Sequence, residues 1–469
     1  MAELLLDLDP SLGRRAGLER ALRQAIGEGR LVAGASLPSS RTLARDLDVS
    51  RATVVAAYEQ LGTEGYLVAR RGAGTRVADL RAVEEDASVE HGLSRSYRYD
   101  FRPGSPDVSL FPRATWLRSL RRVVGESTDR LFEYGDPRGL PELRRVLADH
   151  LGRTRAVSAR PDTVRVYGGF FAAIGFVAEA LGRAGVVRIA VEDPSLFVVR
   201  EVLELAGLDV VAVPVDDGGI DVGALVGLDV GAVLVTPANQ YPLGVTMVPE
   251  RRMALLSWAR RHDAWIIEDD YDGEFRYDRQ PVGALQGLAP DRVVYAGTAS
   301  KTLAPGLRLS WLVVPSALEV VLSAVTHIRS GVSSIEQAAL ADFIGNGELD
   351  RHVRAVRKVY GRRRAELIAR LADDVPWCRL GEVPSAGLHL TVLLDTRSGI
   401  AAGATAGERR REGELIANAA ASSIGLLGLR SHWVGPNETE GLVIGYTRPA
   451  QHRFPVALDR LIGHLRTAG

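Results

Sequence analysis

The chain has 469 residues, of which 46% are hydrophobic and 25% charged, and these are the proportions of a folded globular protein. A chain of this length predicts two or three domains rather than one. Its formal net charge is zero, which argues against a protein that coats nucleic acid or a membrane over its whole surface, so any nucleic-acid binding must be local.

The sequence also predicts the compartment. Its single cysteine, Cys378, cannot form an intramolecular disulfide, as is usual in a reducing cytoplasm. The N-terminus carries acids at Glu3, Asp7 and Asp9 and lacks the basic-then-apolar pattern of a signal peptide. No uninterrupted apolar stretch reaches transmembrane length. We therefore expect a cytoplasmic protein without a membrane partner.

Residues 12–78 form the first predicted domain. Apolar residues recur at helical spacing between Leu18 and Ile26 and predict a first helix. Ser39 and Ser50 each precede a further short helical segment, so we expect them to be the N-caps of two more helices. Two short helices joined by a tight turn make a helix-turn-helix. The glycine-rich stretch after them predicts a two-stranded wing.

Arginines are placed on the parts of this domain that face DNA in winged helices. They lie on the second predicted helix, the third predicted helix and the wing: Arg41, Arg51, Arg70, Arg71 and Arg76. The start of a recognition helix reaches base edges, and helix N-termini hold phosphates. The pattern therefore predicts a DNA-binding domain, with a small helical interaction domain carrying solvated arginines as the alternative.

A linker and a larger domain follow. Residues 79–98 lose apolar periodicity and contain an acidic run and scattered serines, so they predict a solvated linker. Residues 99–469 alternate apolar strands with helical segments, which predicts an α/β fold with a mostly parallel sheet. We expect a large domain over about 130–330 and a smaller α+β domain from about 345. The expected strands lie near 187–191, 209–214, 232–236, 264–268, 292–296 and 309–314.

Lysine is almost absent from this chain, and one of its two lysines lies in an unusual setting. Lys301 follows small and hydroxyl residues, among them Thr298 and Ser300, and Arg308 lies seven residues further on. A lysine amine can lose its proton and form a Schiff base with an aldehyde, which arginine does not do. Hydroxyls, backbone amides and an arginine are the groups that bind a phosphate. The stretch predicts pyridoxal 5′-phosphate (PLP), an aldehyde that carries a phosphate; an ordinary lysine in a strand-to-loop turn is the alternative.

A second stretch contains the acid that PLP requires. Residues 264–267 predict a buried strand that ends in the acids Glu268, Asp269 and Asp270, and ligands of open α/β sheets lie at the carboxyl ends of strands. A PLP protein places a carboxylate on the pyridinium nitrogen, and Asp269 is the candidate. Tyr271 is expected to hydrogen-bond the phenolic oxygen of the ring. A solvated acidic loop is the alternative.

Three motifs in this order resemble those of the PLP-dependent aminotransferases of fold type I. They are Thr236-Pro-Ala-Asn-Gln-Tyr-Pro-Leu-Gly244, Glu268-Asp-Asp-Tyr-Asp-Gly-Glu-Phe275 and Gly297-Thr-Ala-Ser-Lys-Thr-Leu303. In the first domain, Leu37-Pro-Ser-Ser-Arg-Thr-Leu-Ala44 and Val49-Ser-Arg-Ala-Thr-Val54 resemble a GntR-type winged helix. Over almost its whole length the chain thus resembles the MocR-type branch of the GntR regulators. This implies a winged helix-turn-helix, mostly α with a β wing, fused to an aminotransferase-like α/β domain that binds PLP.

The resemblance also implies roles for single residues. The candidate DNA contacts are Ser39, Arg41, Ser50, Arg51, Thr53 and Arg71. In the larger domain, the turn at Gly169 and Phe170 would present backbone N–H groups and a helix N-terminus to the phosphate. Tyr241 stands where aminotransferases often carry an asparagine for the ring oxygen. Leu196 departs from the family, whose members usually place a stacking aromatic there.

The first hypothesis on function is a transcription regulator. Its winged helix would bind a double-stranded DNA operator, and its body would sense a small amine, an amino acid or PLP itself, with an amine displacing Lys301 from the cofactor. Arg430 is the candidate for an effector carboxylate, one position before the place where relatives often carry this arginine. The other hypotheses are a working aminotransferase with an accessory head and a DNA-binding scaffold whose PLP site has decayed. The resemblance implies a homodimer, and no metal site is expected.

Overall fold

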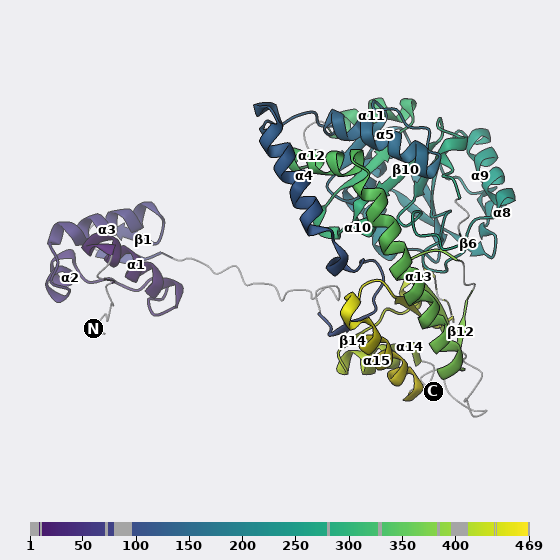
Figure 1. The fold of residues 1–469 in the computed structure, drawn as a ribbon. Helices are drawn as coiled ribbons and strands as arrows, with labels where there is room; N and C mark the ends of the chain where they lie inside the picture. Colours follow the sequence, from purple (N-terminus) through teal and green to yellow (C-terminus); the bar gives the residue numbers. More distant parts are fainter. Residues whose placement is uncertain are drawn as a thin grey trace. The chain divides into compact units, whose positions relative to one another are not determined.

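The structure is a computed structural model, and it describes residues 9, 12–70, 74–78, 96–278, 282–326, 331–381, 385–394, 411–435, 437 and 439–467. The candidate residue Arg71 and all but the last three residues of the expected linker lie outside the described residues. The chain forms two compact units, Met1–Arg95 and Ser96–Gly469, which we call the head and the body (Figure 1).

The head consists of three helices and a two-stranded wing. Its helices are α1 (Arg14–Gly27), α2 (Ser40–Asp46) and α3 (Arg51–Thr63), and its antiparallel strands are β1 (Leu67–Arg70) and β2 (Gly74–Val77). Buried apolar side chains from all of these elements form one core: Leu18, Leu22, Leu43, Val54, Ala57, Leu61, Leu67 and Val77. The expected helix-turn-helix and wing are therefore confirmed.

Both predicted N-caps are present in the head. The Ser39 hydroxyl accepts the N–H of Thr42 at 3.2 Å, and the Ser50 hydroxyl accepts the N–H of Thr53 at 3.0 Å. Each cap satisfies one of the backbone N–H groups that a helix leaves unbonded at its start. Tyr58 donates a hydrogen bond to the carbonyl of Pro38 at 3.0 Å, which ties α3 to the segment before α2.

An eight-stranded sheet forms the centre of the body. Its described strands lie in the order β4-β11-β10-β9-β8-β5-β6-β7. The neighbouring pairs from β10 to β6 are parallel, whereas β11 runs antiparallel to both of its neighbours and β7 runs antiparallel to β6. The expected mostly parallel sheet is thus confirmed, with β11 reversed. The strands are β4 (Val164–Tyr167), β5 (Arg188–Asp193), β6 (Asp209–Asp216), β7 (Gly219–Ile220), β8 (Ala232–Val235), β9 (Trp265–Asp269), β10 (Val293–Thr298) and β11 (Ser310–Val313).

Helices cover both faces of this sheet. On one face α6, α7 and α11 pack against the sheet, and on the other α8 and α9 cover one part while α4, α5 and α12 cover the part around β4 and β11. Because both faces are buried, the central strands are continuous apolar runs in the sequence. These helices are α4 (Arg113–Glu126), α5 (Pro141–Arg155), α6 (Phe170–Arg183), α7 (Phe197–Leu205), α8 (Val222–Leu225), α9 (Pro249–Arg261), α11 (Ser316–Thr326) and α12 (Ser334–Gly345).

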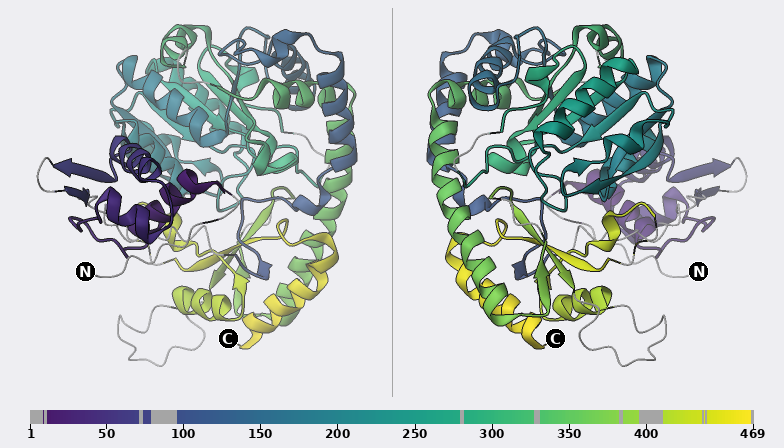
Figure 2. Two further views of the ribbon diagram at one scale, coloured as in Figure 1. Left: turned by 90° about the vertical axis from the view of Figure 1, so that its left-hand side faces the viewer. Right: turned by 90° about the vertical axis from the view of Figure 1, so that its right-hand side faces the viewer.

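The long helix α13 (Glu348–Asp374) runs from the large part of the body into a smaller part (Figure 2). There a three-stranded sheet, β12-β13-β15, packs with α13 and two further helices around another core. The elements of this part are β3 (Tyr99–Asp100), β12 (Cys378–Leu380), β13 (His389–Leu394), α14 (Arg411–Ala421), β14 (Ile424–Gly425), β15 (Gly441–Gly445) and α15 (Phe454–Thr467). Among the residues with a described placement, we find no helix long and apolar enough to span a membrane.

Candidate cofactor site and DNA-binding face

Lys301 lies in the short helix α10 (Ala299–Thr302), directly after β10. Its ammonium group donates a hydrogen bond to the carbonyl of Gly104 at 2.6 Å. Burial lowers the pKa of the Lys301 amine below its ordinary value, and the neighbouring Asp269 and Asp272 oppose this effect. A lowered pKa raises the fraction of neutral amine, which is the form that attacks an aldehyde.

Asp269 ends β9, and in the sheet it lies opposite Ala296 of β10, the strand that leads to Lys301. Its side chain is buried, and its Oδ1 atom has no hydrogen-bond partner among the described residues. Burial raises the pKa of Asp269 well above its usual range, and Lys301 opposes this shift. A buried carboxylate oxygen without a partner is costly. The site therefore offers a place for a ligand N–H, as the pyridinium nitrogen of PLP requires.

Tyr271 lies beside this carboxylate and is held by Asn239. The Tyr271 hydroxyl donates to the Asn239 carbonyl at 3.0 Å, and the Asn239 amide nitrogen donates back to the Tyr271 oxygen at 3.0 Å. The same amide donates to Asp272 at 2.8 Å. A Cβ at Gly387 would come within 2.6 Å of the Asn239 amide nitrogen, so glycine is required there. Sequence reasoning missed Asn239, although it stands inside the Thr236–Gly244 motif.

An anion cradle lies at the start of α6. Gly169 is the N-cap of this 14-residue helix, with φ of 112°, and Phe170 is its first residue. A Cβ at Gly169 would lie 2.5 Å from the Arg308 guanidinium, so the guanidinium directly covers this turn. Helix N-termini and arginines both bind phosphate. Thr298 and Ser300, whose hydroxyls are 3.0 Å apart, lie in the turn that leads into α10. The residues expected to bind a phosphate thus fit one.

Tyr241 adjoins the site, but it does not take the place of the asparagine that hydrogen-bonds the Tyr271 hydroxyl. Its ring stands edge-on to that of Tyr271 with centroids 6.2 Å apart, and its hydroxyl lies 3.1 Å from the Nε2 atom of His432. The hydroxyl of Tyr271 bonds Asn239 instead. Burial raises the pKa of the Tyr241 hydroxyl, so this group stays neutral. Tyr241 therefore forms the aromatic wall toward the smaller part of the body.

The segment at Leu196 begins a helix, which the sequence did not predict. Leu196 is the N-cap residue of α7, and Phe197 is the first residue of that helix. The side chain of Phe197 therefore leaves a helix. Its ring contacts His432 edge-on, with centroids 6.2 Å apart. Leu196 itself packs against the core under α6 and α7.

Arg430 is not among the contacts of the lysine site. It lies in a short 3₁₀ turn, Arg430–His432, and its side chain is 59% exposed. One guanidinium nitrogen lies 3.8 Å from Glu440, and the backbone N–H donates to Glu412. Among the described residues, no cluster of His, Cys, Asp and Glu could hold a metal ion.

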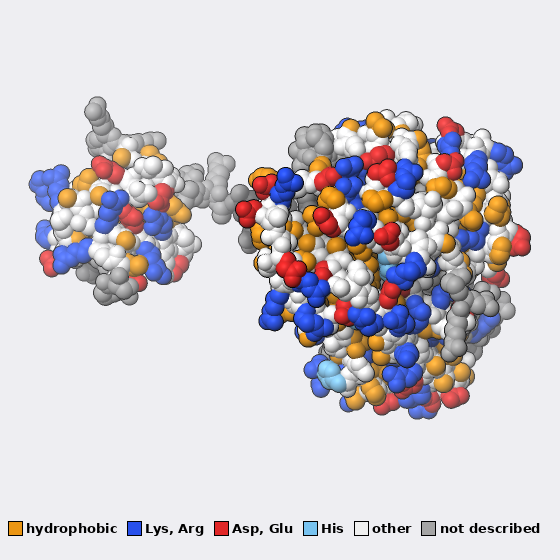
Figure 3. Space-filling view, turned by 45° about the horizontal axis from the view of Figure 1, so that its top comes forward, with side chains coloured by type: hydrophobic (Ala, Val, Ile, Leu, Met, Phe, Trp, Pro, Cys, Tyr) orange, Lys and Arg blue, Asp and Glu red, His pale blue; other side chains and the backbone are white. Residues whose placement is uncertain are grey.

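The DNA-contact candidates of the head lie at helix starts. The side chains of Arg41 and Arg51 are exposed, and the Arg51 Nε donates to the Ser40 hydroxyl at 3.4 Å, so the starts of α2 and α3 meet there. The hydroxyls of Ser50 and Thr53 are 2.8 Å apart. Arg76 of the wing donates to the carbonyl of Gly34 at 2.9 Å. Figure 3 shows arginine side chains at several places on the surface of the head.

Comparison with known proteins identifies the two units. Residues 15–77 match the family described as bacterial regulatory proteins of the gntR family, and residues 109–397 match aminotransferase class I and II. The fold resembles an archaeal alanine:glyoxylate aminotransferase, with a TM-score of 0.68, 23% identity, and coverage of 79% of this chain and 91% of that one.

Two curated relatives match most of the chain. The probable rhizopine catabolism regulatory protein MocR of Rhizobium meliloti is 37% identical over 413 residues, which cover 82% of this chain and 83% of the relative. The pyridoxine biosynthesis transcriptional regulator PdxR of Corynebacterium glutamicum is 31% identical, over 92% of this chain and 91% of the relative. This chain therefore belongs to the MocR-type GntR family, the DNA-binding transcription regulators in which a winged helix-turn-helix precedes an aminotransferase-like domain of fold type I.

Proposed function

We propose that the body binds PLP and that the protein regulates transcription in the cytoplasm in response to a ligand of this site. The observation that carries the proposal is the buried Asp269 oxygen without a partner, next to a half-buried lysine whose pKa is lowered. PLP supplies a pyridinium N–H for the first group and an aldehyde for the second. The Gly169 turn and Arg308 would hold its phosphate.

Each residue of the proposed site would bind a different part of PLP. Asp269 would accept the ring N–H, and Tyr271, held by Asn239, would lie at the phenolic oxygen. Lys301 would hold the aldehyde carbon, and its present acceptor, the Gly104 carbonyl, would lose that hydrogen bond. When bound, PLP supplies an electrophilic carbon whose amine partner can be exchanged. An amino compound in the cell could then compete with Lys301 for the same carbon.

The test is a spectrum of the full-length protein with PLP. The wild type should show a visible absorption band. Reduction with labelled borohydride should remove this band and leave the label on Lys301. Lys301→Ala should lack the band, whereas Lys358→Ala, the only other lysine variant that the chain allows, should keep it. An unchanged spectrum in Lys301→Ala would overturn the assignment. Circular dichroism checks that both variants are folded.

The head would provide the DNA-binding part of the proposed function. We propose that α3 reads an operator and that the signal in the body changes this binding. The signal is an amino compound, an amino acid or PLP itself. The second candidate function is a working aminotransferase with an accessory head, which Lys301 as a proton shuttle would permit. Steady turnover of an amino acid with a keto acid would establish the enzyme, and its absence with operator binding intact would establish the regulator.

We also propose that the body forms a homodimer through an exposed apolar surface. Leu117 and Val124, seven residues apart on one face of α4, are exposed, and so are Phe132 and Tyr134 in the following turn. Isolated exposed apolar residues are ordinary, but a group of four from neighbouring segments marks an interface. A second copy is the partner that we propose, because symmetric self-association is the commonest assembly of bacterial enzymes and regulators of this size.

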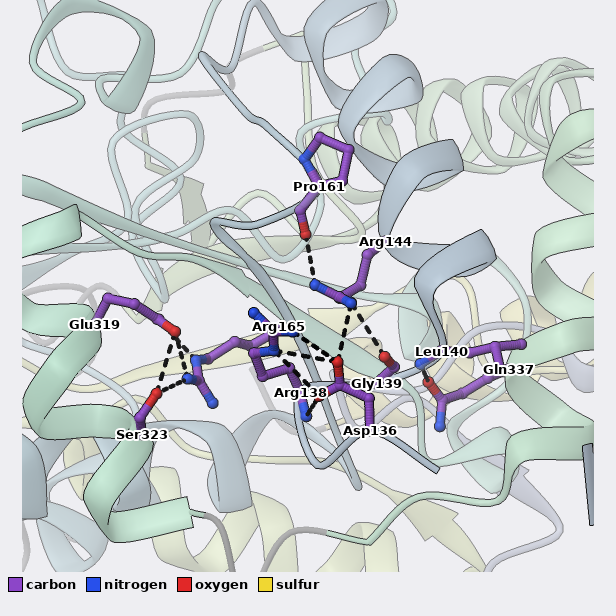
Figure 4. A network of polar contacts seen from close by, with 10 residues as sticks. All are labelled: Asp136, Arg138, Gly139, Leu140, Arg144, Pro161, Arg165, Glu319, Ser323 and Gln337. Atoms are coloured by element: carbon purple, nitrogen blue, oxygen red, sulfur yellow. Dashed lines mark hydrogen bonds and ion pairs between the residues drawn. The ribbon is translucent and has the colours of Figure 1, made fainter. Parts of the chain in front are cut away.

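A polar network fixes the turn that follows these residues in the chain (Figure 4). Asp136 accepts from Arg138 at 2.8 Å and from Arg144 at 3.1 Å, and the backbone N–H of Leu140 donates to Gln337 at 2.7 Å. Light scattering should give a dimer, and Phe132→Ser with Tyr134→Ser should weaken it. The matched control, Leu205→Ser with Val320→Ser, removes two exposed apolar side chains elsewhere. A wild-type monomer saturated with PLP would contradict the proposal.

A further inference from the structure

A hollow of about 340 Å³ lies on the body between the C-terminal end of α5, the first turns of α13 and the loop after β9. This volume lies at the lower end of those that hold small ligands. Its lining residues come from these three elements: His150, Arg153, Thr154, Arg155, Gly273, Glu274, Arg276, Asp350, Val353, Arg354 and Arg357. None of them has a role in the candidate cofactor site.

The lining contains more basic than acidic side chains. It contains five arginines but only two acids. Three of these arginines are paired with acids: Arg153 with Asp350 at 2.9 Å, Arg155 with Asp270 at 2.6 Å, and Arg276 with Asp278 at 2.7 Å. Figure 3 shows basic and acidic side chains interspersed on the surface of the body, as expected for a chain of zero formal net charge.

Two arginines of the hollow differ from the other three. In the described part of the chain, no ion pair within 4.0 Å joins Arg354 or Arg357 to an acid. Arg357 does act on the buried Glu274 of the same lining, where its charge opposes the rise that burial causes in the pKa of that carboxyl. The Nε atom of Arg357 is buried and has no hydrogen-bond acceptor. Arg354 and Arg357 are three residues apart on α13, so their side chains lie on one face of the helix. A buried guanidinium N–H without an acceptor is costly, and a bound anion would satisfy it.

The floor of the hollow is held in place. Arg155 donates two hydrogen bonds to the carboxylate of Asp270, at 2.6 and 2.9 Å, and a third to the carbonyl of Gly273 at 3.1 Å. A Cβ at Gly273 would lie 2.2 Å from Asp270 and 2.3 Å from Arg155, so the loop rests directly on this ion pair. Tyr295 donates to Asp270 from the other side at 2.8 Å. The hollow is therefore a preformed feature of the fold.

We propose that this hollow is a second ligand site of the body and that it binds a small dianion, a phosphate monoester or a dicarboxylate. Arg354 and Arg357 would hold the anion, because guanidinium groups match the two oxygens of a carboxylate or phosphate. Arg155, which lines the hollow, is hydrogen-bonded to Asp270, and Asp270 follows Asp269 directly in the chain.

The experiment uses the full-length protein saturated with PLP, at constant ionic strength. Inorganic phosphate, glycerol 3-phosphate and succinate are titrated separately by calorimetry, so that the three arms distinguish phosphate from carboxylate ligands. The pocket variant is Arg354→Gln with Arg357→Gln. The control is Lys358→Gln with Arg362→Gln, which removes the same charge from exposed positions of the same helix. Circular dichroism compares the folding of all three proteins.

The wild type and the control should bind at least one of these anions. The pocket variant should bind the same anion at least about tenfold more weakly, because a hydrogen bond to a charged group contributes roughly a factor of ten to affinity. Equal affinity in the pocket variant and the control would overturn the proposal, and so would the absence of binding in all three arms at millimolar concentration. The difference in affinity between the pocket variant and the control does not depend on the cofactor site, because an anion that binds at Arg308 adds the same signal to both proteins.

Discussion

Asp269 and Lys301 face each other inside the body, and burial acts on them in opposite directions. It raises the pKa of the Asp269 carboxyl and lowers the pKa of the Lys301 amine, while the attraction between the two charges opposes both shifts. Both side chains come from the carboxyl ends of neighbouring parallel strands, where open α/β sheets bind their ligands. The pair thus combines an acceptor for a ring N–H and a nucleophile for an aldehyde in one site.

Replacing Asp269 by Asn should weaken PLP binding without unfolding the body. The shape of the side chain is kept, but the negative acceptor for the pyridinium N–H is lost, and hydrogen bonds to charged groups contribute about 1.5–3 kcal/mol. We expect PLP affinity to fall by roughly tenfold or more, measured by absorbance titration. Asp217→Asn, an exposed position, is the control. Unchanged affinity in Asp269→Asn would remove this residue from the site.

Glu192 should make the stability of the body depend on pH. Its Oε2 atom accepts from the backbone and hydroxyl of Thr236, its Oε1 atom has no partner, and burial raises its pKa from 4.5 to about 7. The folded state therefore holds a proton that the unfolded state has lost between these values. The free energy of unfolding falls as pH rises through this window, by about 3 kcal/mol at most for this residue.

Glu192→Gln removes this dependence while it keeps one oxygen for Thr236 and places the new amide at the position that has no partner. The difference in melting temperature between variant and wild type should grow in favour of the variant from pH 4.5 to pH 8. Glu201→Gln, at an exposed position of α7, should run parallel to the wild type. Melting curves of Glu192→Gln that also run parallel to the wild type would refute the assigned pKa.

Local sequence signals predicted the parts of the site that lie close together in the chain. Ser39 and Ser50 were recognisable as caps because capping depends on residues three positions away, and Lys301 and Asp269 because each follows a buried strand. The fold type and the family followed from motifs in a fixed order. In each of these cases the deciding interaction is local or is repeated throughout a family.

Contacts between segments that are distant in the chain could not be predicted from local sequence patterns. Gly169 and Arg308 were assigned to the same phosphate, but their contact was not predicted; they meet because β4 and β11 are neighbours in the sheet, and nothing local encodes that pairing. Asn239 was missed because its role depends on Tyr271, more than thirty positions away. The reversed direction of β11 was not visible either, since an apolar strand reads alike in both directions. Arg71 lies outside the described residues, so its predicted contact with DNA remains a prediction.

Arg51→Ala should weaken operator binding and leave the PLP spectrum unchanged. Arg51 is exposed at the first position of α3, and such residues reach base edges in helix-turn-helix proteins. A base contact by arginine contributes about 1–3 kcal/mol of discrimination. The loss should therefore be larger on operator than on random DNA in a gel shift. Arg15→Ala, in α1, is the control for charge. Unaltered affinity for both DNAs would show that α3 does not read the sequence.

Arg430→Ala tests whether the signal is an amino acid. The carboxylate of such an effector, held in a partly dry pocket, needs a cation, because an unpaired buried charge is costly. Arg430 interacts only loosely with Glu440, at 3.8 Å, and its side chain is 59% exposed, so its guanidinium is not held firmly in its present position. Removing one partner of such a charge pair costs about 2–5 kcal/mol.

The variant should therefore keep PLP and operator binding but lose the spectral shift that an amino-acid effector causes, whereas Arg379→Ala, exposed on β12 of the same part, should respond as the wild type does. Titration of both proteins with amino acids and with PLP, followed by absorbance and by operator affinity, shows which of these ligands is the signal. If Arg430→Ala responds normally to amino acids, Arg430 does not hold the carboxylate. If neither protein responds to any amino acid while PLP alone changes operator affinity in both, then PLP is the signal, since the proposed PLP site uses Lys301, Asp269 and Arg308 but not Arg430.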